Sequence, residues 1–201
     1  MARRPHNAAT AGGGKGPGSL RIIAGEWRGR RLPIPDRPGL RPTTDRVRET
    51  LFNWLQPILP GARCLDLFAG AGGLGFEAAS RGAAEVILIE QDRAVAAHLR
   101  ELAGTLRADG VHIVASDALA WLRDTPPSAF DIVFVDPPFA NPLAMPALDL
   151  LVERGWLHAA ARVYLEQDAS NDFVPGVAWT TLREQTAGQA RYRLLTPNNA
   201  L

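Results

Sequence analysis

The stretch Cys64-Leu-Asp-Leu-Phe-Ala-Gly-Ala-Gly-Gly-Leu-Gly-Phe-Glu77 decides the fold of this chain. Its first half is a short apolar run before glycines, typical of a strand covered on both faces, as in a parallel sheet. The glycines then allow a sharp turn and a close approach of the backbone to a ligand. Helix formers begin at Leu74, and a helix N-terminus after such a turn offers unpaired N–H groups. The stretch predicts the strand, turn and helix of an α/β protein.

Three carboxylates lie in, at the end of, or shortly after predicted strands of this sheet. Asp66 lies inside the first apolar run, Glu90 ends the run that begins at Val86, and Asp117 follows the predicted strand 111–115. Because ligands bind beyond the carboxyl ends of parallel strands, all three are candidate site residues, with Glu90 as an acceptor for two ribose hydroxyls. Asp66 could instead cap a turn, Glu90 could be a solvated strand-end charge, and Asp117 could also cap the next helix.

The glycine spacing by itself also matches a nicotinamide-binding fingerprint. Gly70, Gly72 and Gly75 fit the G-x-G-x-x-G pattern, which makes a dehydrogenase an alternative. The chain has no Tyr-x-x-x-Lys pair, and its one lysine, Lys15, lies in glycine-rich sequence. This disfavours a dehydrogenase, a Schiff-base enzyme and a P-loop enzyme.

A second informative stretch is Asp136-Pro137-Pro138-Phe139, directly after the apolar strand 131–135. Two prolines stiffen the backbone and remove two N–H donors, so a carboxylate and a peptide carbonyl remain as fixed acceptors beside an aromatic ring. Such a site suits a flat base with an exocyclic amine, stacked on Phe139 and hydrogen-bonded to Asp136. The alternative is a simple proline turn at a strand end.

Composition limits the class of protein. With 201 residues and 46% hydrophobic content, we expect a single main domain over residues 41–201, preceded by a short extension over 19–40 and a disordered tail over 1–18. The sequence has no apolar signal segment or long apolar run, so we expect a cytoplasmic protein with no membrane contact. Cys64 is the only cysteine, which excludes an internal disulfide and is consistent with a small buried hydrophobe.

The net charge of +1 conceals a strong asymmetry. Residues 1–50 hold eleven Lys or Arg and four Asp or Glu, a balance of +7, whereas the remainder has a balance of −6. A basic arm on an acidic body is typical of a polyanion binder, although it could be only a solubilising tail. Two apolar runs, 20–24 and 30–34, predict a β-hairpin in this region. Its candidate RNA-binding residues are Arg21, Trp27, Arg28, Arg30 and Arg31, and Trp27 could equally anchor the hairpin to the body.

The remaining pattern predicts alternating helices and strands. A helix should begin after Thr43-Thr44, with Val47, Leu51, Trp54, Leu55 and Ile58 on its apolar stripe. The proline-containing segment 141–146 predicts a mobile loop. Further helices are expected at 76–80, 92–106, 118–123 and 147–153, a strand at 162–166, and an antiparallel hairpin at 177–182 and 190–195 that closes the sheet.

Taken together, these motifs resemble a known family. The Asp66-Leu-Phe-Ala-Gly-Ala-Gly stretch, Glu90, Asp117 and Asp136-Pro-Pro-Phe are similar to the S-adenosylmethionine-dependent amino-methyltransferases. The segment Gly39-Leu-Arg-Pro-Thr-Thr-Asp-Arg-Val-Arg-Glu-Thr-Leu-Phe-Asn-Trp-Leu55 narrows the resemblance to the bacterial small-subunit ribosomal RNA guanine-N2 methyltransferases. The similarity covers residues 20–196.

The resemblance implies a Rossmann-like class I methyltransferase with a mixed sheet, acting on 16S rRNA within a small-subunit particle, as a monomer and without a metal. Asp136, Pro137 and Phe139 would hold the target guanine, while Asp66 and the glycine turn would hold the methionine part of S-adenosylmethionine. The implied cofactor-binding residues are Thr43, Arg46, Asp66, Phe68, Gly70, Gly72, Glu90, Gln91, Asp117, Ala118 and Asp136.

Two other readings share these motifs. An adenine-N6 DNA methyltransferase could use the same Asp-Pro-Pro-Phe geometry, but no separate target-recognition domain is evident in 201 residues. A non-catalytic RNA-binding assembly factor could retain the fold, but the intact Asp66, Glu90 and Asp136 motifs disfavour it.

Overall fold

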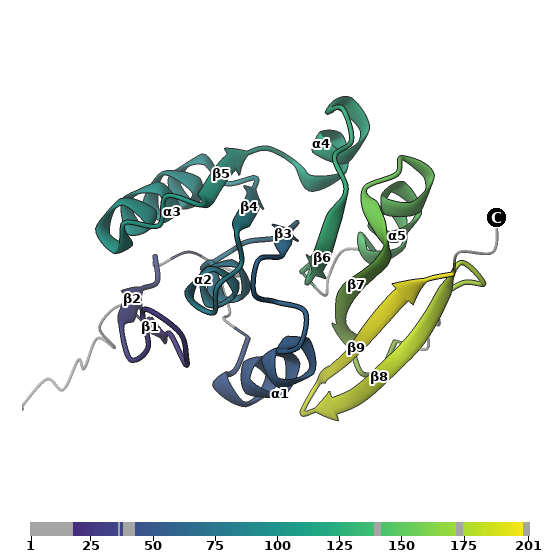
Figure 1. Ribbon diagram of the computed structural model, residues 1–201, viewed down its shortest axis with the longest axis horizontal. Helices are drawn as coiled ribbons and strands as arrows, with labels where there is room; N and C mark the ends of the chain where they lie inside the picture. The colour runs from purple at the N-terminus through teal and green to yellow at the C-terminus, as the bar shows by residue number, and fades with distance from the viewer. Residues whose placement is uncertain (1–17, 36, 38–42, 139–141, 172–174, 199–201) are drawn as a thin grey trace, which may run out of the picture.

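The computed structural model describes residues 18–35, 37, 43–138, 142–171 and 175–198 (Figure 1). Most of the tail predicted as disordered, residues 1–17, therefore lies outside the described residues, as does Phe139. Of the predicted loop 141–146, Asn141 is also outside them.

The core of the fold is a seven-stranded mixed sheet with the order β5-β4-β3-β6-β7-β9-β8. Strands β3 to β7 pair in parallel, and β9 enters antiparallel between β7 and β8. This confirms the predicted α/β sheet closed by an antiparallel hairpin. The strands are β3 (Arg63–Asp66), β4 (Glu85–Glu90), β5 (Val111–Ala115), β6 (Phe130–Val135), β7 (Leu157–Asp168), β8 (Trp179–Ala187) and β9 (Ala190–Pro197).

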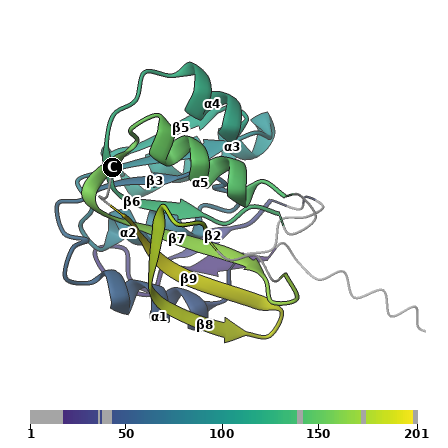
Figure 2. The same cartoon turned by 90° about the vertical axis from the view of Figure 1, so that its right-hand side faces the viewer.

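Helices cover both faces of the sheet, which explains why its central strands are apolar on both sides (Figure 2). One core cluster joins α1, α2 and α3 to one face, and a second joins α4 and α5 to the other. Cys64 is fully buried in the first cluster, as its sequence context predicted. The helices are α1 (Asp45–Leu55), α2 (Gly73–Ser80), α3 (Arg93–Leu106), α4 (Ala118–Asp124) and α5 (Ala144–Glu153).

Several boundaries differ from the sequence prediction. Strand β7 spans Leu157–Asp168 where 162–166 was expected, and β8 spans Trp179–Ala187 where 177–182 was expected. Helix α5 begins at Ala144, so Met145 and Pro146 lie in its first turn rather than in a loop. Proline is compatible with this position because the first helical N–H groups have no partner within the helix. Helix α1 ends at Leu55, so Ile58 lies beyond it and is 39% exposed instead of continuing the apolar stripe.

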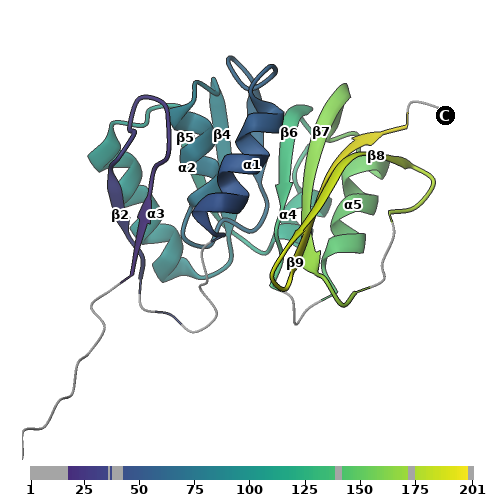
Figure 3. The ribbon, with the colours of Figure 1, turned by 90° about the horizontal axis from the view of Figure 1, so that it is seen from below.

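The N-terminal hairpin consists of β1 (Ser19–Arg21) and β2 (Arg31–Pro33), which pair antiparallel as predicted. It stands at the end of the molecule that carries β4 and β5, opposite the β8–β9 end (Figure 3). Leu20, Ile22 and Leu32 join the same core cluster as α1, α2 and α3, so the hairpin is packed on the body. No helix in the described part of the chain is both long and apolar enough to cross a membrane.

Candidate functional site

The predicted acidic residues meet at one edge of the sheet. Asp66 ends β3 and Glu90 ends β4, while Asp136 directly follows β6. After β3 the chain moves to β4 on one side, and β6 later pairs on the other side of β3. This reversal of strand order is the position where open α/β sheets bind ligands.

The turn between β3 and α2 has a conformation that requires glycine. Gly70 and Gly72 have φ angles of 50° and 76°, in the left-handed region, and Gly72 is the N-cap of α2. A Cβ on Gly75 would lie 2.9 Å from the side chain of Leu88, so only glycine lets α2 pack this closely on β4. The backbone of Gly70 and Gly72 is therefore held beside the acidic edge.

Asp66 is a buried carboxylate with an unused acceptor. Its Oδ2 accepts a hydrogen bond of 3.1 Å from the Gly75 amide. Among the described residues its Oδ1 has no hydrogen bond of normal geometry, although the Phe68 amide interacts with the carboxylate. Burial raises the pKa of Asp66 to about 7, and the charge of Glu90 adds to this, against the Gly75 and Phe68 amides. A cationic or N–H donor ligand would satisfy the free oxygen.

Glu90 is also buried, rather than solvated at its strand end. Its Oε2 accepts from the Gly70 amide at 2.9 Å, and its Oε1 accepts from the Asp92 amide at 2.7 Å. Burial raises its pKa, while the amides of Asp92 and Gly70 oppose the rise. Because each carboxylate oxygen has two lone pairs, both oxygens can still accept ligand hydroxyls.

The other predicted cofactor residues follow β3, β4 and β5 at the same ends of these strands. Asp117 is the N-cap of α4, where it accepts from the Ala120 amide at 2.8 Å, and it remains exposed. Capping and ligand binding were both left open for Asp117, and the structure shows the capping. Phe68 is half-buried, Gln91 is exposed and Ala118 is buried.

Asp136 is held by Thr43, which lies just before the N-cap of α1. The Thr43 hydroxyl donates to Asp136 Oδ2 at 3.0 Å, a contact between residues 93 positions apart in sequence. Burial raises the pKa of Asp136 well above its usual range, and the charge of Glu166 adds to this against the Thr43 hydrogen bond. Pro137 is buried. Arg46, predicted beside Thr43, is exposed, and its backbone carbonyl accepts from the Thr50 hydroxyl at 3.0 Å.

Glu166 and Tyr164 on β7 lie beside Asp136. The sequence predicted only a strand here and did not indicate these two as site residues. Glu166 is 7% exposed, and its Oε2 accepts from the Tyr164 hydroxyl at 2.5 Å. Burial raises the pKa of Glu166, and that of Tyr164 is raised by burial and by the charges of Glu166 and Asp136. A charged residue at the end of an otherwise apolar strand was the available signal.

The predicted RNA-binding residues of the hairpin fall into two groups, exposed arginines and a buried tryptophan. Arg21, Arg28, Arg30 and Arg31 are exposed. Trp27 is only 7% exposed and lies in the core, so the prediction that it stacks on a base is wrong and the anchoring alternative is confirmed. Its backbone N–H also donates to Ser80 Oγ at 3.0 Å.

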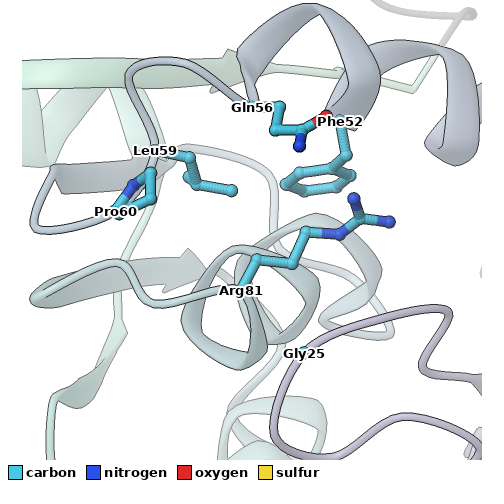
Figure 4. Close-up of a pocket in the computed structure, with 6 residues that line it drawn as sticks. All are labelled: Gly25, Phe52, Gln56, Leu59, Pro60 and Arg81. Atoms are coloured by element: carbon cyan, nitrogen blue, oxygen red, sulfur yellow. The ribbon is translucent and has the colours of Figure 1, made fainter.

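A cavity of about 350 Å³ lies away from this site (Figure 4). It is lined by Gly25, Phe52, Gln56, Leu59, Pro60 and Arg81, with the Arg81 guanidinium 4.9 Å from the Phe52 ring centre. The C-terminal end of α1 and the segment before β3 place it at the amino ends of the strands. It is therefore separate from the acidic residues at the carboxyl ends of the strands.

Comparisons with known proteins agree with this arrangement. The family described as conserved hypothetical protein 95 matches residues 20–196. The chain belongs to this family. Ribosomal RNA small subunit methyltransferase D of Escherichia coli strain K12 is 52% identical over 182 residues, covering 89% of this chain and 90% of the relative. The protein of the same name from Haemophilus influenzae is 45% identical, covering 88% and 93%. The resemblance to small-subunit ribosomal RNA methyltransferases is confirmed.

Solved structures of methyltransferases share the fold. A structure described as the methyltransferase yhhF of Escherichia coli superposes with a TM-score of 0.83 at 47% identity, covering 90% of this chain and 98% of that chain. A methylase structure from Haemophilus influenzae has a TM-score of 0.78 at 42% identity, covering 90% and 99%. The fold is that of the class I methyltransferases, as predicted.

Proposed function

We propose that this protein transfers a methyl group from S-adenosylmethionine to the exocyclic N2 amine of a guanine in small-subunit ribosomal RNA. The observation that carries the proposal is the pair formed by buried Asp66 and half-buried Asp136, brought to one sheet edge beside the glycine turn. Two close relatives carry the name ribosomal RNA small subunit methyltransferase D, which supports the substrate class.

The residues at the glycine turn fit the cofactor. The free Oδ1 of Asp66 suits the cationic amino group of the methionine part, because a buried carboxylate oxygen needs a donor. The two oxygens of Glu90 suit adjacent ribose hydroxyls, and exposed Asp117 suits the adenine amine. When bound, S-adenosylmethionine supplies a methyl group already activated by its sulfonium.

The residues after β6 must aim the target amine. A guanine N2 amine is a weak nucleophile because its lone pair is delocalised into the ring. Hydrogen bonds from N2–H to Asp136 and to the Pro137 carbonyl would localise that lone pair and orient it, and such positioning can contribute several kcal/mol. The raised pKa of Asp136 also makes its carboxylate a better acceptor for the proton that N2 must lose.

The substrate must present its base outside a stack. A guanine that reaches Asp136 has to leave its neighbours, so an unpaired loop nucleotide is a cheaper target than one in a helix. The four exposed hairpin arginines supply the positive surface for RNA phosphates. Asp-Pro-Pro geometry alone would accept an adenine amine too, so recognition of guanine needs a further group.

The test combines substrate mapping with one variant. Wild-type protein, labelled S-adenosylmethionine and small-subunit ribosomal RNA or particles from cells lacking this enzyme should give N2-methylguanosine at one position, identified by mass spectrometry. Asp136→Ala should lower the methylation rate by about 100-fold or more while cofactor affinity by calorimetry stays nearly unchanged. Asp124→Ala, at the exposed end of α4, is the matched control and should retain the wild-type rate. No transfer to guanine N2 by the wild type would refute the proposal.

A further inference from the structure

Asp136 has a second carboxylate as its neighbour. We infer that Glu166 accepts the N1–H of the target guanine and so selects guanine over bases whose ring nitrogen is itself an acceptor. The inference rests on the proposed function and concerns the same site. It assigns Glu166 a direct contact with the substrate and Tyr164 the task of positioning Glu166.

The strand register brings the two carboxylates together. Val135 of β6 pairs with Leu165 of β7, so Asp136 and Glu166 are the next residues of two parallel neighbours. Phe134 and Tyr164 lie in the core cluster shared with α1, and side chains two residues apart on a strand share a face. Asp136 and Glu166 therefore lie on the α1 side, where Thr43 reaches Asp136. The charge of Glu166 adds to the rise that burial causes in the pKa of Asp136, as expected for neighbours.

One oxygen of Glu166 is fixed and the other is available. Tyr164, fully buried, donates its hydroxyl to Oε2 at 2.5 Å. Among the described residues no hydrogen bond to Oε1 occurs. Tyr192, which pairs with Glu166 across β9, donates its own hydroxyl to Gln185 at 2.8 Å. Gln167 accepts from Arg193 at 2.8 Å, so neither neighbour serves Glu166.

Glu166 is largely buried, but its Oε1 is not among the fully enclosed atoms without a partner, so a donor from a ligand can reach this oxygen. Burying a carboxylate without its hydrogen bonds costs free energy, and the adjacent charge of Asp136 adds repulsion. Two neighbouring N–H donors from one ligand would satisfy Asp136 and Glu166 together and reduce that repulsion.

The hydrogen-bonding edge of guanine matches two adjacent acceptors. Guanine presents the N1–H donor next to the N2 amine, so N2–H can face Asp136 while N1–H faces Glu166. Adenine presents an acceptor, N1, next to its amine. Its N1 lone pair would face the Glu166 carboxylate, which disfavours adenine even though its amine could reach Asp136.

The experiment compares RNA carrying guanine with RNA carrying 2-aminopurine at the target position. 2-Aminopurine keeps the amine at position 2, but its N1 is an acceptor. A site built to accept N1–H should prefer guanine by about 1,000-fold or more in kcat/KM. Glu166→Gln can donate its amide to N1, so the preference should fall at least about 10-fold. The missing O6 of 2-aminopurine affects both enzymes equally and cancels in this comparison.

Two further variants keep the result interpretable. Tyr164→Phe removes the hydroxyl that fixes Glu166, so it should also reduce the preference for guanine over 2-aminopurine. If Glu166→Gln is inactive, this variant alone tests the role of Glu166. Asp168→Asn removes a half-buried carboxylate two residues along β7 and should keep the wild-type preference. Calorimetry should show unchanged S-adenosylmethionine affinity in all three variants.

The outcomes separate this inference from the proposed function. If the wild type methylates guanine N2 and both Glu166→Gln and Tyr164→Phe keep its full preference over 2-aminopurine, the role of Glu166 is overturned and the proposed function stands. If the wild type methylates the N2 amine of neither base, the proposed function itself fails.

Discussion

Asp66 is placed to accept a hydrogen bond from a ligand, but its burial lowers the stability of the protein alone. It is 1% exposed, and burial dominates the rise of its pKa from 3.8 to about 7. An acid whose pKa is raised on folding has its most favourable contribution at low pH. The contribution is lost as the pH rises from the unfolded pKa to the folded pKa, here between about 4 and 7.

The residue-scale prediction is therefore a pH-dependent gain from Asp66→Asn. Asparagine keeps an acceptor for the Gly75 amide but does not ionise. Between pH 5 and pH 8 its free energy of unfolding, relative to wild type, should rise by about 2 kcal/mol, measured by urea denaturation. The same variant should bind S-adenosylmethionine about 10-fold or more weakly. A stability difference that does not change with pH would contradict the assignment of this pKa.

At the scale of elements, a buried carboxylate in α2 attaches the N-terminal hairpin. Glu77 is fully buried and accepts the amides of Ile23 and Ala24 at 2.8 and 3.0 Å. It also pairs with Arg81 at 2.7 Å and lies 3.5 Å from Arg48 Nη1. Arg48, itself buried, donates to the backbone carbonyl of Arg21 at 2.7 Å. Helix α1, helix α2 and the hairpin are thus joined through one ionic network.

Breaking this network should loosen the hairpin. Glu77→Gln removes one charge opposite buried Arg48, and a buried pair that loses one partner typically costs about 3 to 5 kcal/mol. Glu85→Gln is the matched control, because Glu85 pairs with Arg63 at 2.6 Å while both side chains are about one-third exposed. It should cost about 1 kcal/mol or less. Chemical denaturation measures both, and hydrogen exchange at Ile23 and Ala24 should increase in Glu77→Gln alone. Equal losses in the two variants would argue against the docking role.

At the scale of the whole molecule, positive and negative charge are separated along the chain. The basic segment includes the hairpin at one end of the sheet, and the acidic remainder builds the site and the β8–β9 end (Figure 3). Exposed Arg28, Arg30 and Arg31 lie on this hairpin, which is packed on α1 and α2 rather than tethered. A fixed basic surface can orient an RNA relative to Asp136.

Replacing Arg28, Arg30 and Arg31 together by Ala should weaken RNA binding in a salt-dependent way. Loss of these phosphate contacts should flatten the slope of log affinity against log salt by about two to three units, without changing S-adenosylmethionine affinity. Arg123, Arg154 and Arg183 are exposed and outside the hairpin, so their joint replacement by Ala removes the same charge as a control. A hairpin variant with the control's affinity and slope would place the RNA surface elsewhere.

The sequence by itself determined the strand, glycine turn and helix, and it identified Asp66, Glu90 and Asp136 as site candidates. Local patterns were sufficient because the carboxyl ends of parallel strands share one edge, so each residue after a strand is placed without knowing the strand order. The same local patterns located most helices and strands. They placed the start of α5 and the end of the α1 stripe wrongly, where packing rather than periodicity sets the boundary.

Only the tertiary structure decided which residues meet across the chain. Thr43 reaches Asp136, Glu166 lies beside Asp136, and Trp27 is buried against the body. Each of these depends on the pairing or docking of segments far apart in sequence, and a shift of one residue in strand register would turn Glu166 to the other face. The physical reason is that a strand's own pattern specifies which residues alternate, whereas its neighbours and its register are selected by the packing of the whole core.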